Sequence, residues 1–194
     1  SYTGLRASGE QAGVDISIAL PAVTKVSQID SVNRFASRYL KGPVISFGGI
    51  HPQASNYKDI LHDIKSMGLK GIKLHPDYQD TYFDDIRYER IIDRASELGL
   101  ITVVHAGADP KCPDDVHCTP QMARKVIDEV RPENLVLAHM GGLVMWDEVE
   151  KYLVGQDVYF DTGVVLDRMP QEQFIRMVRS HGADRILFGT DSPW

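Results

Sequence analysis

The sequence is poor in cysteine, in basic charge and in long apolar runs. Two cysteines in 194 residues exclude a fold that depends on a disulfide framework. Lysine and arginine number 21 against 27 aspartates and glutamates, a net charge of −6, so no basic face for nucleic acid is expected. No apolar run approaches the about 20 residues of a membrane span, and the polar start lacks a signal core. We therefore expect a cytoplasmic protein that binds neither nucleic acid nor membrane.

The two cysteines lie close together in one segment. Cys112 and Cys118 have His117 between them, so a disulfide or a zinc knuckle is conceivable there. Zinc signatures, however, use closer cysteine pairs and more of them. We expect both thiols to be free.

Short apolar runs that end in a polar residue recur along the chain. They cover residues 44–51, 71–75, 101–105, 135–139, 158–161 and 186–191, and an earlier run covers 14–20. Helical patterns with apolar residues three and four apart lie between them, and two of these stop at Gly68 and Gly99. Thr119 before Pro120 predicts another helix start. A repeated strand and helix predicts an α/β fold, the (β/α)8 TIM barrel, in one domain spanning 1–194.

The count of predicted strands falls short of a closed barrel. Seven strand ends are visible, whereas the fold has eight, and typical full barrels run to about 250 residues. The chain begins with a helix-like segment, 5–13, and no helix follows its last strand. The sequence thus predicts a barrel that lacks the first strand and the last helix in the residues given.

Three strand-end residues have the chemistry of a metal site. His105, His139 and Asp191 each follow at least three residues of an apolar run, and the carboxyl ends of barrel strands share one rim, where catalytic groups gather. Imidazoles and a carboxylate converging there could hold a divalent cation, most simply zinc, with a position open for water or substrate. Asp191 is the best candidate for the base that takes a proton from a metal-bound water.

These strand ends resemble a known family. The segments 71–76 (Gly-Ile-Lys-Leu-His-Pro), 104–107 (Val-His-Ala-Gly), 138–142 (Ala-His-Met-Gly-Gly) and 188–194 (Phe-Gly-Thr-Asp-Ser-Pro-Trp) are similar to the motifs of the amidohydrolase superfamily. The closest branch is that of TIM-barrel metal-dependent hydrolases that also contains zinc decarboxylases. The resemblance implies a metal ligand at His105, a ligand or catalytic imidazole at His139, and a metal-bound acid or base at Asp191.

The sequence departs from the family at one motif. Members open with a His-x-His pair on the first strand, which supplies two further ligands, and no histidine here has a second one two positions away. Either that strand lies upstream of Ser1, or this barrel holds metal differently. Binuclear relatives bridge two metals with a carboxylated lysine on the fourth strand, where Lys73 stands.

Lys73 and His75 share one face of their strand because they are two residues apart. We expect His75 to contact substrate or support the metal, and Lys73 to pack its stem inside the barrel and pair with a carboxylate; a binuclear site is not favoured.

Three further residues complete the predicted site. His51, in the same phase as His75, and Trp194 are candidates for substrate contact, and core packing is an equal alternative for the tryptophan. Asp161 could orient a ligand histidine or simply cap a turn. His62 and His181 are expected to be exposed.

Three functions from two classes remain open. The leading prediction is a metal-dependent hydrolase that uses an activated water on an amide, lactone or ester bond of a small molecule. The alternative is non-hydrolytic decarboxylation of a small aromatic or unsaturated acid, a lyase reaction. The third possibility is not an enzyme: a non-catalytic barrel that has lost its metal-binding histidine pair. The expected partner is a small-molecule substrate, and homo-oligomer formation is left open.

Overall fold

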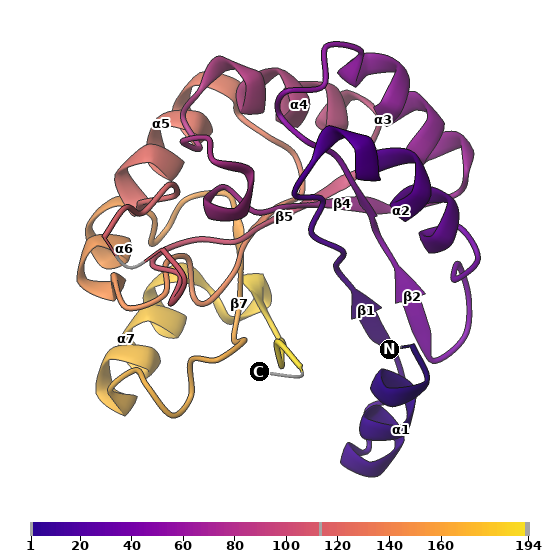
Figure 1. The fold of residues 1–194 in the computed structure, drawn as a ribbon. Coiled ribbons are helices and arrows are strands. Elements are labelled where there is room, and N and C mark those ends of the chain that lie inside the picture. The colour runs from indigo at the N-terminus through magenta and orange to yellow at the C-terminus, as the bar shows by residue number, and fades with distance from the viewer. Residues whose placement is uncertain (1, 113, 193–194) are drawn as a thin grey trace.

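The computed structural model describes residues 2–112 and 114–192, in which strands and helices alternate. The first part contains α1 (Tyr2–Ala12), β1 (Ser17–Ala19), the 3-10 helix η1 (Val26–Gln28), α2 (Ile29–Ala36), β2 (Val44–Ser46), β3 (Gly48–Gly49), α3 (Tyr57–Ser66), β4 (Gly71–Leu74), η2 (Asp77–Gln79) and α4 (Ile86–Glu97). The second part contains β5 (Ile101–Val104), α5 (Pro120–Val130), β6 (Leu135–Leu137), α6 (Trp146–Tyr152), β7 (Tyr159–Asp161), α7 (Gln171–His181), η3 (Ala183–Arg185) and β8 (Ile186–Leu187). The helices cover the outside of a curved sheet (Figure 1).

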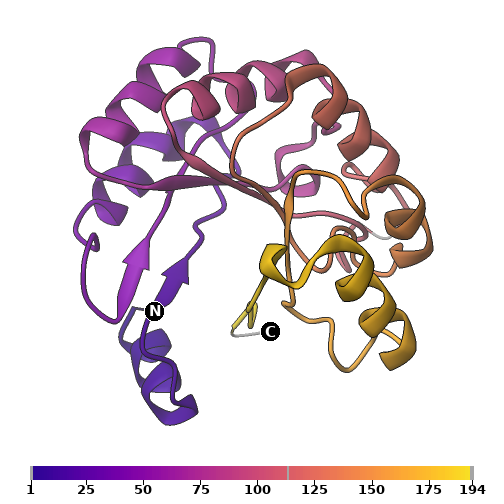
Figure 2. The same cartoon turned by 180° about the vertical axis from the view of Figure 1, so that it is seen from behind.

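All strand pairs are parallel, as the barrel prediction requires. Six strands run in the order β3-β4-β5-β6-β7-β8, and β1 pairs with β2 in a separate sheet. The predicted strand 44–51 is split at Phe47, so its first half pairs with β1 and its second half with β4. Among the residues described, no strand joins β1 to β8. The described residues therefore fill seven barrel positions, and β1 and β8 border the open side (Figure 2).

Alternate strand residues serve two different cores. One set packs against the helices in the main cluster, and includes Ile72, Leu74, Val104, Leu135, Leu137 and Phe160. The other set lies inside the curve, where Phe47, Val103 and Val136 form a smaller buried cluster. This period of two is what a strand imposes. It follows that Lys73 and His75, out of phase with Ile72 and Leu74, belong to the inner face.

The helix boundaries follow local signals. The Thr119 side chain accepts a hydrogen bond from the Met122 backbone N–H, and Pro120 is the first residue of α5, as the sequence predicts. Gly68 and Gly99 follow α3 and α4 with φ of 85° and 62°, a conformation that glycine adopts without steric cost. These ends set the short turns that lead back into β4 and β5.

Gly107 brings the loops after β5 and β6 together. Its φ is 86°, and a Cβ at this position would collide with the backbone of Leu143. The two residues form a parallel bridge beyond the ends of their strands. Only glycine permits this approach, so the site-forming loops of neighbouring strands are held side by side.

His181 is buried, so the expectation that it is exposed is wrong. It is 4% exposed, and its ring stacks on Phe160 with centroids 4.0 Å apart. Nε2 donates to the Val158 carbonyl at 2.9 Å, and Nδ1 accepts from the Gly155 backbone N–H at 3.1 Å. His62, by contrast, is exposed on α3 as predicted. Both ring nitrogens of His181 are thus satisfied only while the ring is neutral.

This arrangement predicts a specific acid sensitivity. Burial lowers the pKa of His181 below its usual 6.5, so below about pH 6.5 the unfolded chain binds a proton that the native ring does not. Below this pH the free energy of unfolding should decrease as the solution is made more acidic. His181 should contribute up to about 1.4 kcal/mol of this decrease per pH unit. Urea unfolding of His181→Gln between pH 7 and 5 should show a shallower fall than the parent, while His62→Gln should match the parent. Equal slopes in all three proteins would contradict the assignment.

Cys112 and Cys118 are both free thiols, and Cys118 is buried. No helix in the described part of the chain is both long and apolar enough to cross a bilayer.

Candidate functional site

Two histidines at the ends of β4 and β5 lie ring on ring. His75 and His105 each follow their strand by one residue, in phase with the inner face, and are 8% and 5% exposed. Their ring centroids are 4.2 Å apart at an interplanar angle of 4°. The parallel register that pairs Leu74 with Val104 places the two following residues side by side. Tyr78 covers the other face of His75, with centroids 3.7 Å apart.

His139 reaches the same place by a different route. It is in phase with Leu135 and Leu137, which face the helices, so a continued strand would carry its side chain outward. Instead the backbone turns at φ of 59°. The turn is held at both ends: the His139 N–H donates to Asp161 Oδ1 at 3.0 Å, and Trp146 Nε1 donates to the His139 carbonyl at 3.0 Å.

The rings of His139 and His105 meet edge to edge through nitrogen atoms. His139 Nδ1 lies 2.8 Å from the Gly163 carbonyl oxygen, which can only accept, so Nδ1 carries the proton and Nε2 presents a lone pair. This Nε2 is 3.1 Å from His105 Nδ1. Two nitrogens that share a tetrahedral zinc at 2.0–2.1 Å would lie about 3.3 Å apart. The spacing therefore fits a pair of ligands to one cation.

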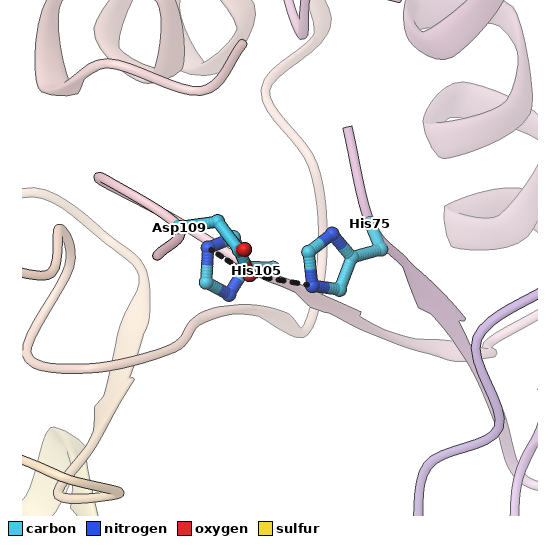
Figure 3. A group of neighbouring side chains, drawn as sticks. All are labelled: His75, His105 and Asp109. Carbon is cyan, nitrogen blue, oxygen red and sulfur yellow. Dashed lines mark ion pairs between the residues drawn. The ribbon is translucent and has the colours of Figure 1, made fainter. Parts of the chain in front are cut away.

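Carboxylates surround the opposite nitrogen of His105. Its Nε2 is 3.7 Å from Asp77 Oδ2 and 4.0 Å from Asp109 Oδ2, and within residues 2–112 and 114–192 it has no hydrogen-bond partner. Asp109 also lies 3.7 Å from His75 Nε2. Figure 3 shows Asp109 beside the stacked rings, with a dashed contact to each of them. His75, His105 and Asp109 each offer a ligand atom within 4.8 Å of the others, so the donor set on this side also suits a metal ion.

Burial sets the charge state of these rings. It lowers the pKa of His75 to about 3 and lowers that of His105 further, with Lys73 and the other histidines adding repulsion. Both imidazoles are consequently neutral near pH 7, the form in which histidine binds metal. Burial raises the pKa of Asp77, although the contacts with His117 oppose the change.

Asp191, Asp161 and Lys73 form the other edge of the site. Asp191 is exposed at the rim, but its carboxyl is partly desolvated, which raises its pKa against the opposing effects of His139 and Lys73. Asp161 Oδ1 accepts from the His139 and Gly163 backbone N–H groups at 3.0 and 2.9 Å. Burial lowers the pKa of Lys73, whereas the charges of Asp161 and Asp191 raise it. The charges of these three groups therefore interact with one another across the site.

The structure gathers most of the sequence-predicted residues, but not all. His105, His139, Asp191, Asp161, Lys73 and His75 lie in mutual contact or electrostatic reach. His51 is buried, but its described hydrogen-bond partners are Gln53 and Thr24 rather than the other histidines. Trp194 falls outside the described residues. Trp146 packs in the core and anchors His139.

Sequence reasoning missed two carboxylates. Asp77 follows His75 by two residues and opens η2. Asp109 lies in the irregular segment between β5 and α5. The available signal was position alone, because both follow a strand end that carries a predicted site residue.

A barrel of parallel strands with neutral imidazoles and carboxylates at the carboxyl ends defines the class of metal-dependent barrel enzymes. Residues 2–194 match the family model described as Amidohydrolase, and the chain belongs to this family. The resemblance in the strand-end motifs is therefore confirmed, as are the fold class and the enzymatic character that the family implies. A search of curated proteins gave no match.

Solved structures share the fold. The 2,6-dihydroxybenzoate decarboxylase from Rhizobium is 17% identical with a TM-score of 0.70, over 95% of this chain and 75% of that one. The 5-carboxyvanillate decarboxylase from Novosphingobium aromaticivorans, complexed with manganese, is 15% identical with a TM-score of 0.76, over 96% of this chain and 69% of that one. An uncharacterized TIM-barrel protein from Bordetella bronchiseptica is 18% identical with a TM-score of 0.72, over 100% of this chain and 70% of that one. The family and the donor cluster together support a divalent metal.

Proposed function

We propose that this protein is a metal-dependent decarboxylase of a small aromatic or unsaturated carboxylic acid. The observation that carries a metal reaction is the 3.1 Å contact between His105 Nδ1 and His139 Nε2. The choice of decarboxylation is supported by the fold neighbours that act on 2,6-dihydroxybenzoate and 5-carboxyvanillate. Hydrolysis through a metal-activated water is the second candidate, favoured by the match to the amidohydrolase family.

His105, His139 and Asp191 are the residues that would hold the cation, which we take to be zinc. The cation would fix the substrate carboxylate and draw charge from the reacting group. His139 keeps its proton on Nδ1 through the Gly163 carbonyl, so its Nε2 faces the site as an acceptor. The neutral rings of His75 and His105 and the buried inner face exclude bulk water. His51, His75 and Trp194 remain proposed substrate contacts.

Decarboxylation breaks one carbon–carbon bond, releases carbon dioxide and places a proton on the carbon that is left. Asp191 is our candidate for the group that relays this proton: its carboxylate would bind the cation with one oxygen and leave the other free to take up and pass on the proton, and burial favours that uptake because it raises the pKa of the carboxyl. Lys73 and Asp161 would support this carboxyl from the interior. Hydrolysis would use the same group in the opposite sense, as the base that takes a proton from water.

The two reactions differ in the fate of water oxygen. Zinc-loaded protein should be incubated in ¹⁸O-water with 2,6-dihydroxybenzoate, 5-carboxyvanillate and a set of esters, lactones and amides. We expect carbon dioxide from an acid, with no ¹⁸O in the organic product. Appearance of ¹⁸O in a product carboxylate, without carbon dioxide, would replace decarboxylation by hydrolysis. Protein that neither holds zinc nor turns over any compound would favour a non-catalytic barrel.

A further inference from the structure

Asp77 lies against the nitrogen of His105 that points away from His139. Its side chain is 0% exposed, and Oδ1 accepts from the His117 backbone N–H at 3.1 Å. The second oxygen, Oδ2, has no hydrogen-bond partner among the residues that the structure describes. It is 3.7 Å from His105 Nε2, which is also buried and unpartnered. A buried acceptor and a buried ring nitrogen thus face each other, and each costs free energy if it stays unpaired.

The proton of His105 decides how this contact works. A neutral imidazole carries its proton on one nitrogen only. A proton on Nδ1 would be donated to His139, but the lone pair on Nε2 would then face two carboxylates. A proton on Nε2 would face those carboxylates favourably and would leave two lone pairs, 3.1 Å apart, on His105 and His139. Only the second arrangement offers both lone pairs to a cation.

We propose that Asp77 is a positioning residue that holds His105 in the tautomer protonated on Nε2, so that Nδ1 is free to bind the metal beside His139. This inference rests on the proposed function. A carboxylate behind a metal-binding histidine fixes the ring and raises its basicity. Charged acceptors make the stronger hydrogen bonds, so this tautomer should prevail over donation to His139 Nε2.

Asp109 is the competing acceptor, and the geometry favours Asp77. Asp109 Oδ2 is farther from His105 Nε2, at 4.0 Å, and is shared with His75 Nε2 at 3.7 Å. Its Oδ1 accepts from the Lys111 backbone N–H at 2.7 Å. Asp77 Oδ2 is closer and has no other hydrogen-bond partner. We therefore assign Asp109 to His75 and Asp77 to His105.

The variant Asp77→Asn tests the assignment because the amide can sit in one orientation only. The His117 N–H requires an oxygen at the Oδ1 position, so the amide nitrogen takes the place of Oδ2 and presents N–H groups to His105. Because an amide N–H needs an acceptor, Nε2 of His105 should then present its lone pair, and the ring proton should move to Nδ1. We expect zinc affinity to fall about 10- to 100-fold, measured by titration with zinc alone against a chelator. Asp80→Asn, which removes an equal charge near His117 from a side chain 98% exposed, should leave the affinity unchanged.

Asp77→Ala separates tautomer control from mere support. Alanine removes the acceptor for the His117 N–H and adds no donor. Asparagine keeps that acceptor and adds a donor that faces His105. Tautomer control predicts that zinc affinity falls in the order parent, Asp77→Ala, Asp77→Asn. A purely structural role predicts that Asp77→Ala is the weakest. Retained parental affinity in both variants, or a loss in Asp109→Asn alone, would overturn the proposal.

Nitrogen-15 spectra of the histidine rings give a readout that needs no activity. His105 should be protonated on Nε2 in the parent, with and without zinc, and on Nδ1 in metal-free Asp77→Asn. A parent that binds no zinc would refute the proposed function, yet this tautomer shift would still support the role of Asp77. A parent in which zinc binds His105 through Nε2 would refute the role of Asp77 and leave a metal enzyme in place.

Discussion

Replacing His105 with alanine is expected to remove divalent metal from the protein. Its ring stands between two sets of donors: Nδ1 is 3.1 Å from His139 Nε2, and Nε2 lies within 4.0 Å of the Asp77 and Asp109 carboxylates. A cation on either side of the ring loses a ligand. Loss of an outer partner of a metal ligand typically costs about 10–100-fold in affinity, so loss of the ligand itself should exceed about 100-fold.

The measurement is a zinc titration with a competing chelator, together with the zinc content after dialysis. His51→Ala is the matched control, because it removes another buried strand-end histidine whose described hydrogen-bond partners are Gln53 and Thr24. It should bind zinc as the parent does. His139→Ala tells which side of His105 is occupied, since only the Nδ1 side depends on it. Parental zinc affinity in His105→Ala would show that the metal lies elsewhere.

The architecture of the site was predictable where the chain stays in register with a strand. The alternation in 71–75 and 101–105 places Lys73, His75 and His105 on the inner face, and the structure agrees. Each assignment needs only the period of two and a polar residue at the end of an apolar run. Local signals were similarly sufficient for the start of α5 at Thr119.

The position of His139 could not be derived from its own strand. The period of two would send its ring toward the helices, and a backbone with φ of 59° reverses it. A non-glycine residue adopts this conformation at a cost of about 1–2 kcal/mol, which the surroundings must offset. The offset comes from Asp161 and Trp146, which hydrogen-bond the two backbone groups of His139. Contacts from residues 22 and 7 positions away are invisible in a local pattern.

Two other differences arose from weighting one signal over another. His181 ends α7 and precedes a glycine, a setting that suggests exposure. It also follows Val178, Met177 and Phe174 by three, four and seven residues, and so continues the apolar stripe of the helix. Asp77 and Asp109 lie in the connections that follow β4 and β5, where no strand period applies and the tertiary fold decides which side chains turn inward. The strand ends thus indicated where the site lies, but not its full set of carboxylates.

Asp191→Asn is expected to lower kcat by about 10²–10⁴-fold, the usual contribution of a positioned proton donor. Asp191 has φ of 51°, and asparagine is among the few residues that accept this conformation readily, so the fold should persist. The amide keeps the shape of the carboxyl but has no proton to deliver to carbon. Carbon dioxide release should be followed at saturating zinc, because the same carboxyl is proposed to touch the cation.

The pH dependence distinguishes a proton donor from a residue that only holds the metal. If Asp191 passes the proton to carbon, kcat at saturating zinc should be highest below the pKa of its carboxyl and should decrease as pH rises through that pKa; burial raises this pKa above 3.8 in the metal-free protein. In a plot of kcat against pH, the parent should show this decrease as a descending limb. Asp191→Asn should lack the descending limb. Asp157→Asn, at a carboxylate 99% exposed, should keep both the parental rate and the limb. A fall in zinc affinity with an unchanged pH profile would reduce Asp191 to a ligand, and more than a tenth of the parental kcat at saturating zinc would remove it from the chemistry.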